Sequence, residues 1–202
     1  MKLGVFISII LFSILVGGCT TNNIIDTSNN TTTQIKSMYN LTSEQIKEKI
    51  IRDGSICYFA YGANMDSTLI QLRGVNYSLR DPGTLYNWSL TFNKIGNIKK
   101  GTGFANIIPK ENSKVEGVVY YTNMASITDL DVHEGYPTQY NRTELIININ
   151  GTIKKCQVYI ANPEATSFAL KPSRIYLNSM LQGKDYLSRE YYTMLLNVTT
   201  ID

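Results

Sequence analysis

The chain has few of the side chains that hold metals or redox groups. Its 202 residues include one histidine, three cysteines and one tryptophan. So few ligands exclude most zinc, haem and iron–sulfur frameworks. Charged residues make up 17% of the chain, below the ~25% of typical soluble domains. The net charge of +3 is small and no Lys/Arg cluster carries it, which excludes a nucleic-acid-binding protein. We expect no metal, no cofactor and no nucleic-acid partner.

Common catalytic motifs are absent as well. The sequence contains no G-x-S-x-G, no P-loop and no H-E-x-x-H. The single histidine, His133, has no second ligand near it, and we expect it on the solvent side of a helix. The groups left for chemistry are a carboxylate, a glycine-bearing turn and some of the 14 tyrosines.

The first 19 residues have the pattern of an export signal. An apolar run from Leu3 to Val16 follows Lys2 and would rise about 21 Å as a helix, less than the ~30 Å hydrocarbon core of a membrane. The run ends in Val16-Gly17-Gly18-Cys19, which resembles a lipobox. We expect a signal peptide over residues 1–19 and a lipid anchor on Cys19 at the outer face of a membrane. An uncleaved anchor helix is the alternative.

Residues 20–41 have the composition of a solvated tether. They are rich in Thr, Asn and Ser and lack an apolar period. The tetrapeptide Thr42-Ser43-Glu44-Gln45 then has the pattern of a capping box and predicts a short helix over residues 42–54. We expect one catalytic domain over residues 55–198.

Short apolar runs separated by turn residues follow within this domain. Predicted strands are Ile56–Tyr61, Thr84–Phe92, Phe104–Ile108, Val115–Thr122, Tyr140–Ile149 and Thr152–Ala161. Predicted helices are Asp66–Leu72, Ser126–Glu134, Pro172–Leu181 and Ser188–Asn197. The irregular order of these elements argues against a Rossmann domain. It predicts an α+β fold, a small mixed β-barrel with flanking helices, closed or half closed.

The dipeptide Asn150-Gly151 predicts a tight hairpin and its register. With a two-residue turn, Arg142 faces Tyr159 across the two strands. Tyr140 shares the face of Arg142, so Tyr140 and Tyr159 become diagonal neighbours roughly 7–8 Å apart. They could form the floor of a polar pocket, although a chain with 14 tyrosines can pair two of them by chance.

Cys57 and Cys156 both fall in predicted strands. Export makes a disulfide between them possible, and two buried thiols are an equal alternative.

Glu134 is the carboxylate with the most suggestive position. On the predicted helix it shares one face with Ile127, Leu130 and Asp131. An acid on that face lies beside apolar neighbours and at the negative end of the helix dipole, so its pKa should rise. An exposed glutamate at a frayed helix end is the alternative.

The turn Tyr61-Gly62-Ala63-Asn64-Met65 follows an apolar strand directly. Gly and Asn tolerate positive φ, so this turn could direct successive N–H groups into one concavity that suits a carboxylate or an oxyanion. Most strand–glycine turns are only turns, which is the simpler reading.

These features coincide with the pattern of one family. Residues Tyr58 to Met65 closely resemble the "YFAYGSN" segment that opens γ-glutamylcyclotransferases. Residues 104–109 and 115–120 are similar to paired strands of that family, and residues 130–135 with Tyr140 resemble its "LD..EG…Y" segment. Pro172-Ser173, with Tyr176 and Met180, is similar to its C-terminal helix. The resemblance spans about residues 56–197.

The resemblance implies a barrel fold and a reaction that converts a γ-glutamyl amino acid or amine to 5-oxoproline and a free amine. It makes Glu134 the general acid and base, without a metal. It implies that the substrate is bound by the loop and by two tyrosines, namely Tyr61, Gly62, Ala63, Asn64, Met65, Tyr140 and Tyr159. Ala63 stands where serine is commonest, which bears on substrate preference more than on chemistry.

Two other classes of protein remain open. One is a lipoprotein of the same fold that binds γ-glutamyl or amino-acid ligands without turnover, and the other is a structural envelope protein. For an enzyme, the leaving group could be an amino acid, a dipeptide, a polyamine or a cell-surface γ-glutamyl product.

Overall fold

The computed structural model describes residues 41–97 and 99–202. The predicted signal peptide, Cys19 and residues 20–40 of the predicted tether lie outside the described residues. None of the helices found in the described ranges is both long and apolar enough to cross a membrane. Residues 47–202 form one unit, which contains every other candidate site residue.

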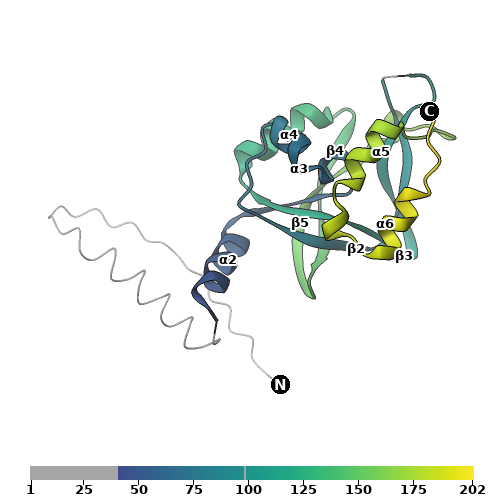
Figure 1. Cartoon of the computed structure of the whole chain (residues 1–202). Coiled ribbons are helices and arrows are strands. Elements are labelled where there is room, and N and C mark those ends of the chain that lie inside the picture. Colours follow the sequence, from purple (N-terminus) through teal and green to yellow (C-terminus); the bar gives the residue numbers. More distant parts are fainter. Residues whose placement is uncertain (1–40, 98) are drawn as a thin grey trace, which may run out of the picture. The chain divides into compact units, whose positions relative to one another are not determined.

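Five strands within the described residues close into a barrel in the order β1-β3-β2-β4-β5 (Figure 1). The strands are β1 (Ile56–Ala60), β2 (Leu79–Ile95), β3 (Gly103–Thr122), β4 (Tyr140–Ile149) and β5 (Thr152–Ala161). Among these five strands, β1 and β5 pair in parallel and the other neighbours pair antiparallel. The predicted α+β barrel with flanking helices is therefore confirmed, in its closed form.

The strands β2 and β3 are longer than the sequence pattern predicts. Two predicted strands are the two ends of β3, and the polar stretch between them continues as strand. That stretch is mostly exposed, so no alternation of apolar residues marks it. The register of β2 against β3 shifts beside Tyr86. Asn87 and Asn112 adopt left-handed backbone conformations there, with φ of 63° and 58°, which asparagine tolerates better than most residues.

The hairpin of β4 and β5 has the predicted register. Ile149 pairs with Thr152 and Arg142 pairs with Tyr159. Asn150 and Gly151 both have positive φ, 52° and 84°, as a type I′ turn requires.

Each helix in the described residues begins after a side chain that accepts a hydrogen bond from a backbone N–H of its first turn. The helices are α2 (Ser43–Gly54), α3 (Ser67–Leu72), α4 (Met124–Glu134), α5 (Arg174–Leu181) and α6 (Arg189–Leu196). The predicted capping box forms, since the Thr42 N–H donates to Gln45 Oε1 and the Gln45 N–H donates to Thr42 Oγ1. In Figure 1, α3 and α4 lie together on one part of the barrel and α5 and α6 on another.

A disulfide joins Cys57 of β1 to Cys156 of β5, with 4.5 Å between the two Cα atoms. It resolves the alternative between a disulfide and two thiols, and it lies at the parallel pairing that closes the barrel.

Candidate active site

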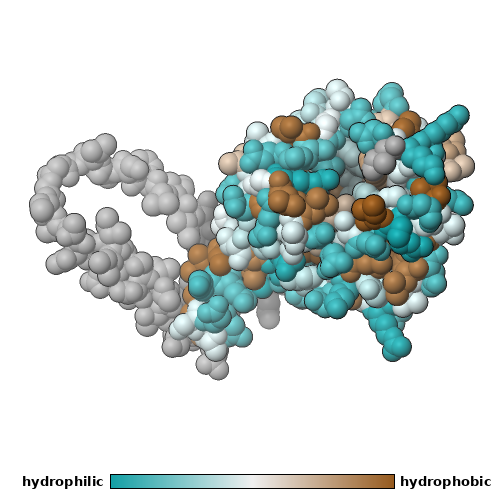
Figure 2. Space-filling view, turned by 45° about the horizontal axis from the view of Figure 1, so that its top comes forward, coloured by the Kyte–Doolittle hydropathy of each residue, from teal (hydrophilic) through white to brown (hydrophobic). Residues whose placement is uncertain are grey.

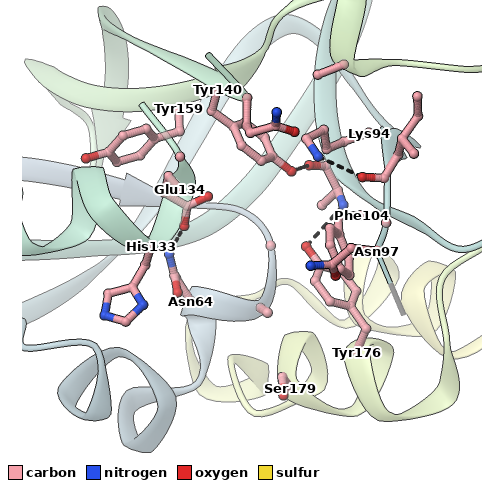
Figure 3. A pocket seen from close by; sticks show the side chains of 18 of the residues that line it. Asn64, Lys94, Asn97, Phe104, His133, Glu134, Tyr140, Tyr159, Tyr176 and Ser179 are labelled. Atoms are coloured by element: carbon pink, nitrogen blue, oxygen red, sulfur yellow. Dashed lines mark hydrogen bonds between the residues drawn. The ribbon is translucent and has the colours of Figure 1, made fainter. Parts of the chain in front are cut away.

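A pocket of about 1040 Å³ opens where the end of β1, the ends of α3 and α4, and the start of α5 meet the barrel. Figure 3 shows two groups of polar side chains in it. Glu134 and Asn64 lie on one side of the Tyr140 ring, and Lys94 lies on the other. A pocket with a few convergent polar groups is the usual form of a small-molecule site.

Glu134 is the last residue of α4, and the helix ends because Gly135 adopts the left-handed conformation at φ 63°. Ile127 and Leu130 on the same helix are fully buried, which confirms the predicted face. The Glu134 side chain is 13% exposed and lines the pocket. The sequence pattern therefore identified a carboxylate that the fold does place in a cavity.

The two oxygens of the Glu134 carboxylate have different surroundings. Oε1 accepts hydrogen bonds from Asn64 Nδ2 at 2.9 Å and from Arg73 Nη1 at 3.1 Å. Oε2 has no hydrogen-bond donor among the described residues. The carboxylate is thus fixed in place through one oxygen, while the other remains available to a ligand.

Burial raises the pKa of Glu134 above the ordinary value of a glutamate. The charge of Arg73, the hydrogen bond from Asn64 and the charge of Lys94 act in the opposite direction and moderate the rise. The C-terminal end of α4 also disfavours a negative charge. A carboxyl with a raised pKa can exchange a proton near neutral pH more readily than an ordinary glutamate.

Asn64 is the centre of the hydrogen-bond network around Glu134. It is buried, and its Nδ2 donates to Tyr58 Oη as well as to Glu134, both at 2.9 Å. Its Oδ1 accepts from Arg73 Nη1 at 2.8 Å, and its backbone oxygen accepts from Tyr120 Oη at 2.8 Å. Because Nδ2 and Oδ1 of Asn64 both have hydrogen-bond partners, these partners fix the orientation of the amide.

The expectation of a positive-φ nest in the loop is wrong. Gly62 has φ −113°, and Ala63, Asn64 and Met65 form one 3-10 turn. Glycine is needed at position 62 for space, because a Cβ there would lie 2.8 Å from Tyr176 Oη. The N–H groups of Gly62 and Asn64 still have no backbone acceptor among the described residues.

Met65 does not line the pocket, unlike the other loop residues predicted to contact the substrate. Its side chain is fully buried in the core. The 3-10 turn directs it toward Gly183, where a Cβ would lie 3.0 Å from the Met65 Cβ. Its predicted contact with the substrate therefore finds no support in the geometry.

Tyr61, Tyr140 and Tyr159 all line the pocket, and all are buried. Tyr140 Oη donates to the Ala105 carbonyl at 2.8 Å, and Tyr159 Oη donates to Asp131 Oδ1 at 2.7 Å. Tyr61 Oη donates to the Tyr159 carbonyl. Because these hydroxyl protons are already donated to protein acceptors, the tyrosines offer rigid walls and acceptor oxygens.

Two cations of the pocket were not predicted from the sequence. Arg73 caps the C-terminal end of α3 and forms an ion pair with Glu134. Lys94, near the end of β2, is only 6% exposed, and its Nζ donates to the Ile95 carbonyl at 2.7 Å. Each is a single basic residue outside any recognisable motif, so no sequence pattern separates it from a surface charge. His133, by contrast, is exposed at the pocket rim, as predicted.

Within residues 41–97 and 99–202, no three His, Cys, Asp or Glu side chains gather as ligands of a metal ion would.

Solved structures of other proteins have a similar fold. A solved structure of a gamma-glutamyl cyclotransferase is 26% identical with a TM-score of 0.64, covering 73% of this chain and 90% of that chain. An uncharacterized protein from Homo sapiens gives the same values. YkqA from Bacillus subtilis is 20% identical with a TM-score of 0.63, covering 76% of this chain and 60% of that chain, and shares the fold. No curated protein matches the chain.

The sequence model of one family, described as gamma-glutamyl cyclotransferase, AIG2-like, matches residues 58–178. This range includes β1, the loop that carries Asn64, all of α4 and most of α5. The match thus covers most of the pocket, including Glu134. The chain belongs to the AIG2-like gamma-glutamyl cyclotransferase family.

Proposed function

We propose that the protein converts a γ-glutamyl amino acid or amine to 5-oxoproline and the free amine, with Glu134 as the general acid and base. One observation carries the proposal. A buried carboxylate is fixed through Oε1 by Asn64 and Arg73, while Oε2 remains available in the pocket.

The reaction needs positioning and proton transfer. The substrate's α-amine forms a bond to its own γ-carbonyl carbon, and the bond from that carbon to the leaving nitrogen breaks. The reacting atoms belong to one molecule, so holding it in a folded conformation removes much of the barrier. The walls formed by Tyr61, Tyr140 and Tyr159 would restrict the glutamyl group to such a conformation.

Glu134 Oε2 would move the protons. The attacking nitrogen begins as an ammonium, which cannot attack, and it ends as the N–H of a lactam. It gives up two protons in total, and the leaving nitrogen gains two when it departs as an ammonium. Glu134 accepts each proton as a base and returns it as an acid, so water is not a reactant. Its raised pKa suits both roles.

The backbone N–H groups of Gly62 and Asn64 are the available donors for the oxyanion on the γ-carbonyl carbon. They belong to the loop that also carries the side chain fixing Glu134. Preorganised donors of this kind contribute strongly to acyl-transfer reactions.

The direct test is Glu134→Gln, assayed for 5-oxoproline from γ-glutamyl-alanine. Glutamine keeps an oxygen for Asn64 and Arg73, so we expect an unchanged fold and a loss of turnover of about 10²–10⁴-fold. Glu144→Gln, on the exposed outer side of β4, is the matched control and should keep full activity. Near-normal turnover in Glu134→Gln would contradict the assignment.

The same assay separates the enzyme from its alternatives. A binding lipoprotein would bind γ-glutamyl-alanine without forming 5-oxoproline. A structural envelope protein predicts no pocket, and the cavity of about 1040 Å³ argues against it.

We propose in addition that this activity is exported and held at a membrane through Cys19. The support is the N-terminal sequence pattern together with the disulfide, since disulfides persist in oxidising compartments. Incorporation of a labelled fatty acid into the wild type but not into Cys19→Ala is the expected result. Equal labelling of the two proteins would contradict a lipid on Cys19.

A further inference from the structure

Lys94 is a buried ammonium group that the proposed proton transfers do not use. Its residue is 6% exposed, yet it lines the pocket. A lysine that is almost fully buried usually has a partner of opposite charge. No carboxylate among the described residues forms an ion pair with Lys94.

The contacts of Lys94 leave it short of acceptors. Its Nζ has three protons, and the Ile95 carbonyl accepts one of them. Two aromatic rings lie near it, with Nζ 5.9 Å from the Phe104 ring centre and 5.7 Å from that of Tyr140. Burial lowers the pKa of Lys94, and the charge of Glu134 opposes this effect. An anion from a ligand would supply the missing acceptors and the missing charge.

The position of Lys94 in the pocket indicates which part of the substrate it would contact. In Figure 3 it lies across the Tyr140 ring from Glu134, near Phe104 and Asn97. Arg73 forms an ion pair with the Glu134 side chain. If the substrate's α-amine lies at Glu134 Oε2, its α-carboxylate, on the carbon that bears the amine, would lie close to Arg73. Once Arg73 is paired with the α-carboxylate, Lys94 is the other cation of the pocket, and the leaving group is the part of the substrate that still lacks a partner.

Resting on the function proposed above, we infer that Lys94 binds a carboxylate of the leaving group. The enzyme would therefore act on γ-glutamyl amino acids and peptides in preference to γ-glutamyl amines. A cationic leaving group, such as a polyamine, would be repelled by the same ammonium.

Two apolar side chains at the rim are compatible with a peptide-like leaving group. Val132 and Ile175 both line the pocket, and both are 78% exposed. On the face shown in Figure 2, apolar residues form separate patches with hydrophilic residues between them. Val132 and Ile175 offer local apolar contacts at the rim, and the recognition of charge is left to Lys94.

A matched pair of substrates tests this inference. γ-Glutamyl-alanine and γ-glutamyl-ethylamide differ only in the carboxylate of the leaving group. We expect the wild type to show a higher kcat/KM for γ-glutamyl-alanine. In Lys94→Met, kcat/KM for γ-glutamyl-alanine should fall about 10- to 100-fold, as for a lost charge-assisted hydrogen bond, while the value for the ethylamide should change by less than about 3-fold.

Two further variants support the reading. Lys94→Arg keeps the positive charge and should keep the preference for γ-glutamyl-alanine. Lys155→Met removes an exposed lysine of β5 and should change neither substrate. If Lys94→Met does not fold, the inference can still be contradicted by a wild type that shows equal kcat/KM for the two compounds.

Several outcomes would overturn the inference. Equal losses on both substrates would assign Lys94 to the glutamyl α-carboxylate. A wild type without preference, or an unchanged Lys94→Met, would remove Lys94 from substrate recognition. If the wild type forms no 5-oxoproline from either compound, the proposed function fails separately. Calorimetric titration of the same two compounds into the wild type and Lys94→Met then measures the carboxylate preference without turnover.

Discussion

The two charged side chains inside the pocket, Glu134 and Lys94, are held in opposite ways. Glu134 is fixed by the side chains of Asn64 and Arg73, and Asn64 is itself held by two tyrosine hydroxyls. Within the part of the chain that the structure describes, Lys94 has one hydrogen-bond acceptor, the backbone oxygen of its neighbour Ile95. A proton-transfer group needs a fixed position relative to the reacting atoms. A group that recognises leaving groups of different size benefits from fewer constraints.

Among the substitutions that change how Glu134 is held, Asn64→Asp is expected to have the largest effect on turnover. The substitution keeps the size of the side chain and places a second carboxylate beside Glu134, where 2.9 Å now separates Nδ2 from Oε1. Like charges at that distance favour the protonated form of the pair. We expect turnover at neutral pH to fall by about 10²-fold, and the acid limb of the pH–rate profile to move to higher pH. A fall in turnover with an unmoved acid limb would assign Asn64 a purely structural role.

A smaller effect is expected from removing the cation in Arg73→Met. The wild type should lose activity as the pH falls through the pKa of Glu134, because the protonated carboxyl cannot accept a proton from the substrate. Since burial raises this pKa, the loss should begin at a higher pH than for an ordinary glutamate.

Arg73 lowers the pKa of Glu134, so Arg73→Met should move the acid limb further up in pH. Turnover at neutral pH should fall about tenfold, as for the loss of one hydrogen bond to a charged group. If the acid limb of the pH–rate profile stays in place or moves to lower pH, Arg73 does not lower the pKa of Glu134. Arg142→Met offers a comparison, because Arg142 pairs with Asp131 rather than with Glu134.

The smallest effect is expected from Ala63→Ser, which restores the residue commonest in the resembling segment. Ala63 lines the pocket and is 7% exposed, so a hydroxyl there adds one polar contact near a carboxylate that Asn64 and Arg73 already hold through Oε1. We expect KM for γ-glutamyl-alanine to change by no more than about 3-fold, with kcat unchanged. An increase of kcat by tenfold or more would mean that the network around Glu134 lacks a group in the wild type.

The sequence predicts those parts of the fold that depend on local patterns. Asn150-Gly151 determines the hairpin register because both residues tolerate positive φ, and Glu134 follows from the apolar face of α4 and the glycine after it. The polar middle of β3 has no such pattern. It belongs to a strand only because β2 pairs with it, which is a long-range contact.

The site is predictable only where a residue type is unusual for its position. A glutamate at a helix C-terminus is unusual, whereas an arginine there, such as Arg73, is favourable and attracts no notice. Lys94 becomes exceptional only once the barrel buries it. The need for Gly62 arises from Tyr176, more than a hundred residues later in the chain, so backbone conformation alone suggested the wrong reason for it.

Cys57 and Cys156, which the disulfide joins, are 99 positions apart in the sequence, and the helix that ends in Glu134 lies between them. A protease that cuts one surface loop between the two cysteines would therefore release no fragment. Glu134 and β1, which leads into the loop that carries Asn64, would therefore stay covalently joined after such a cut.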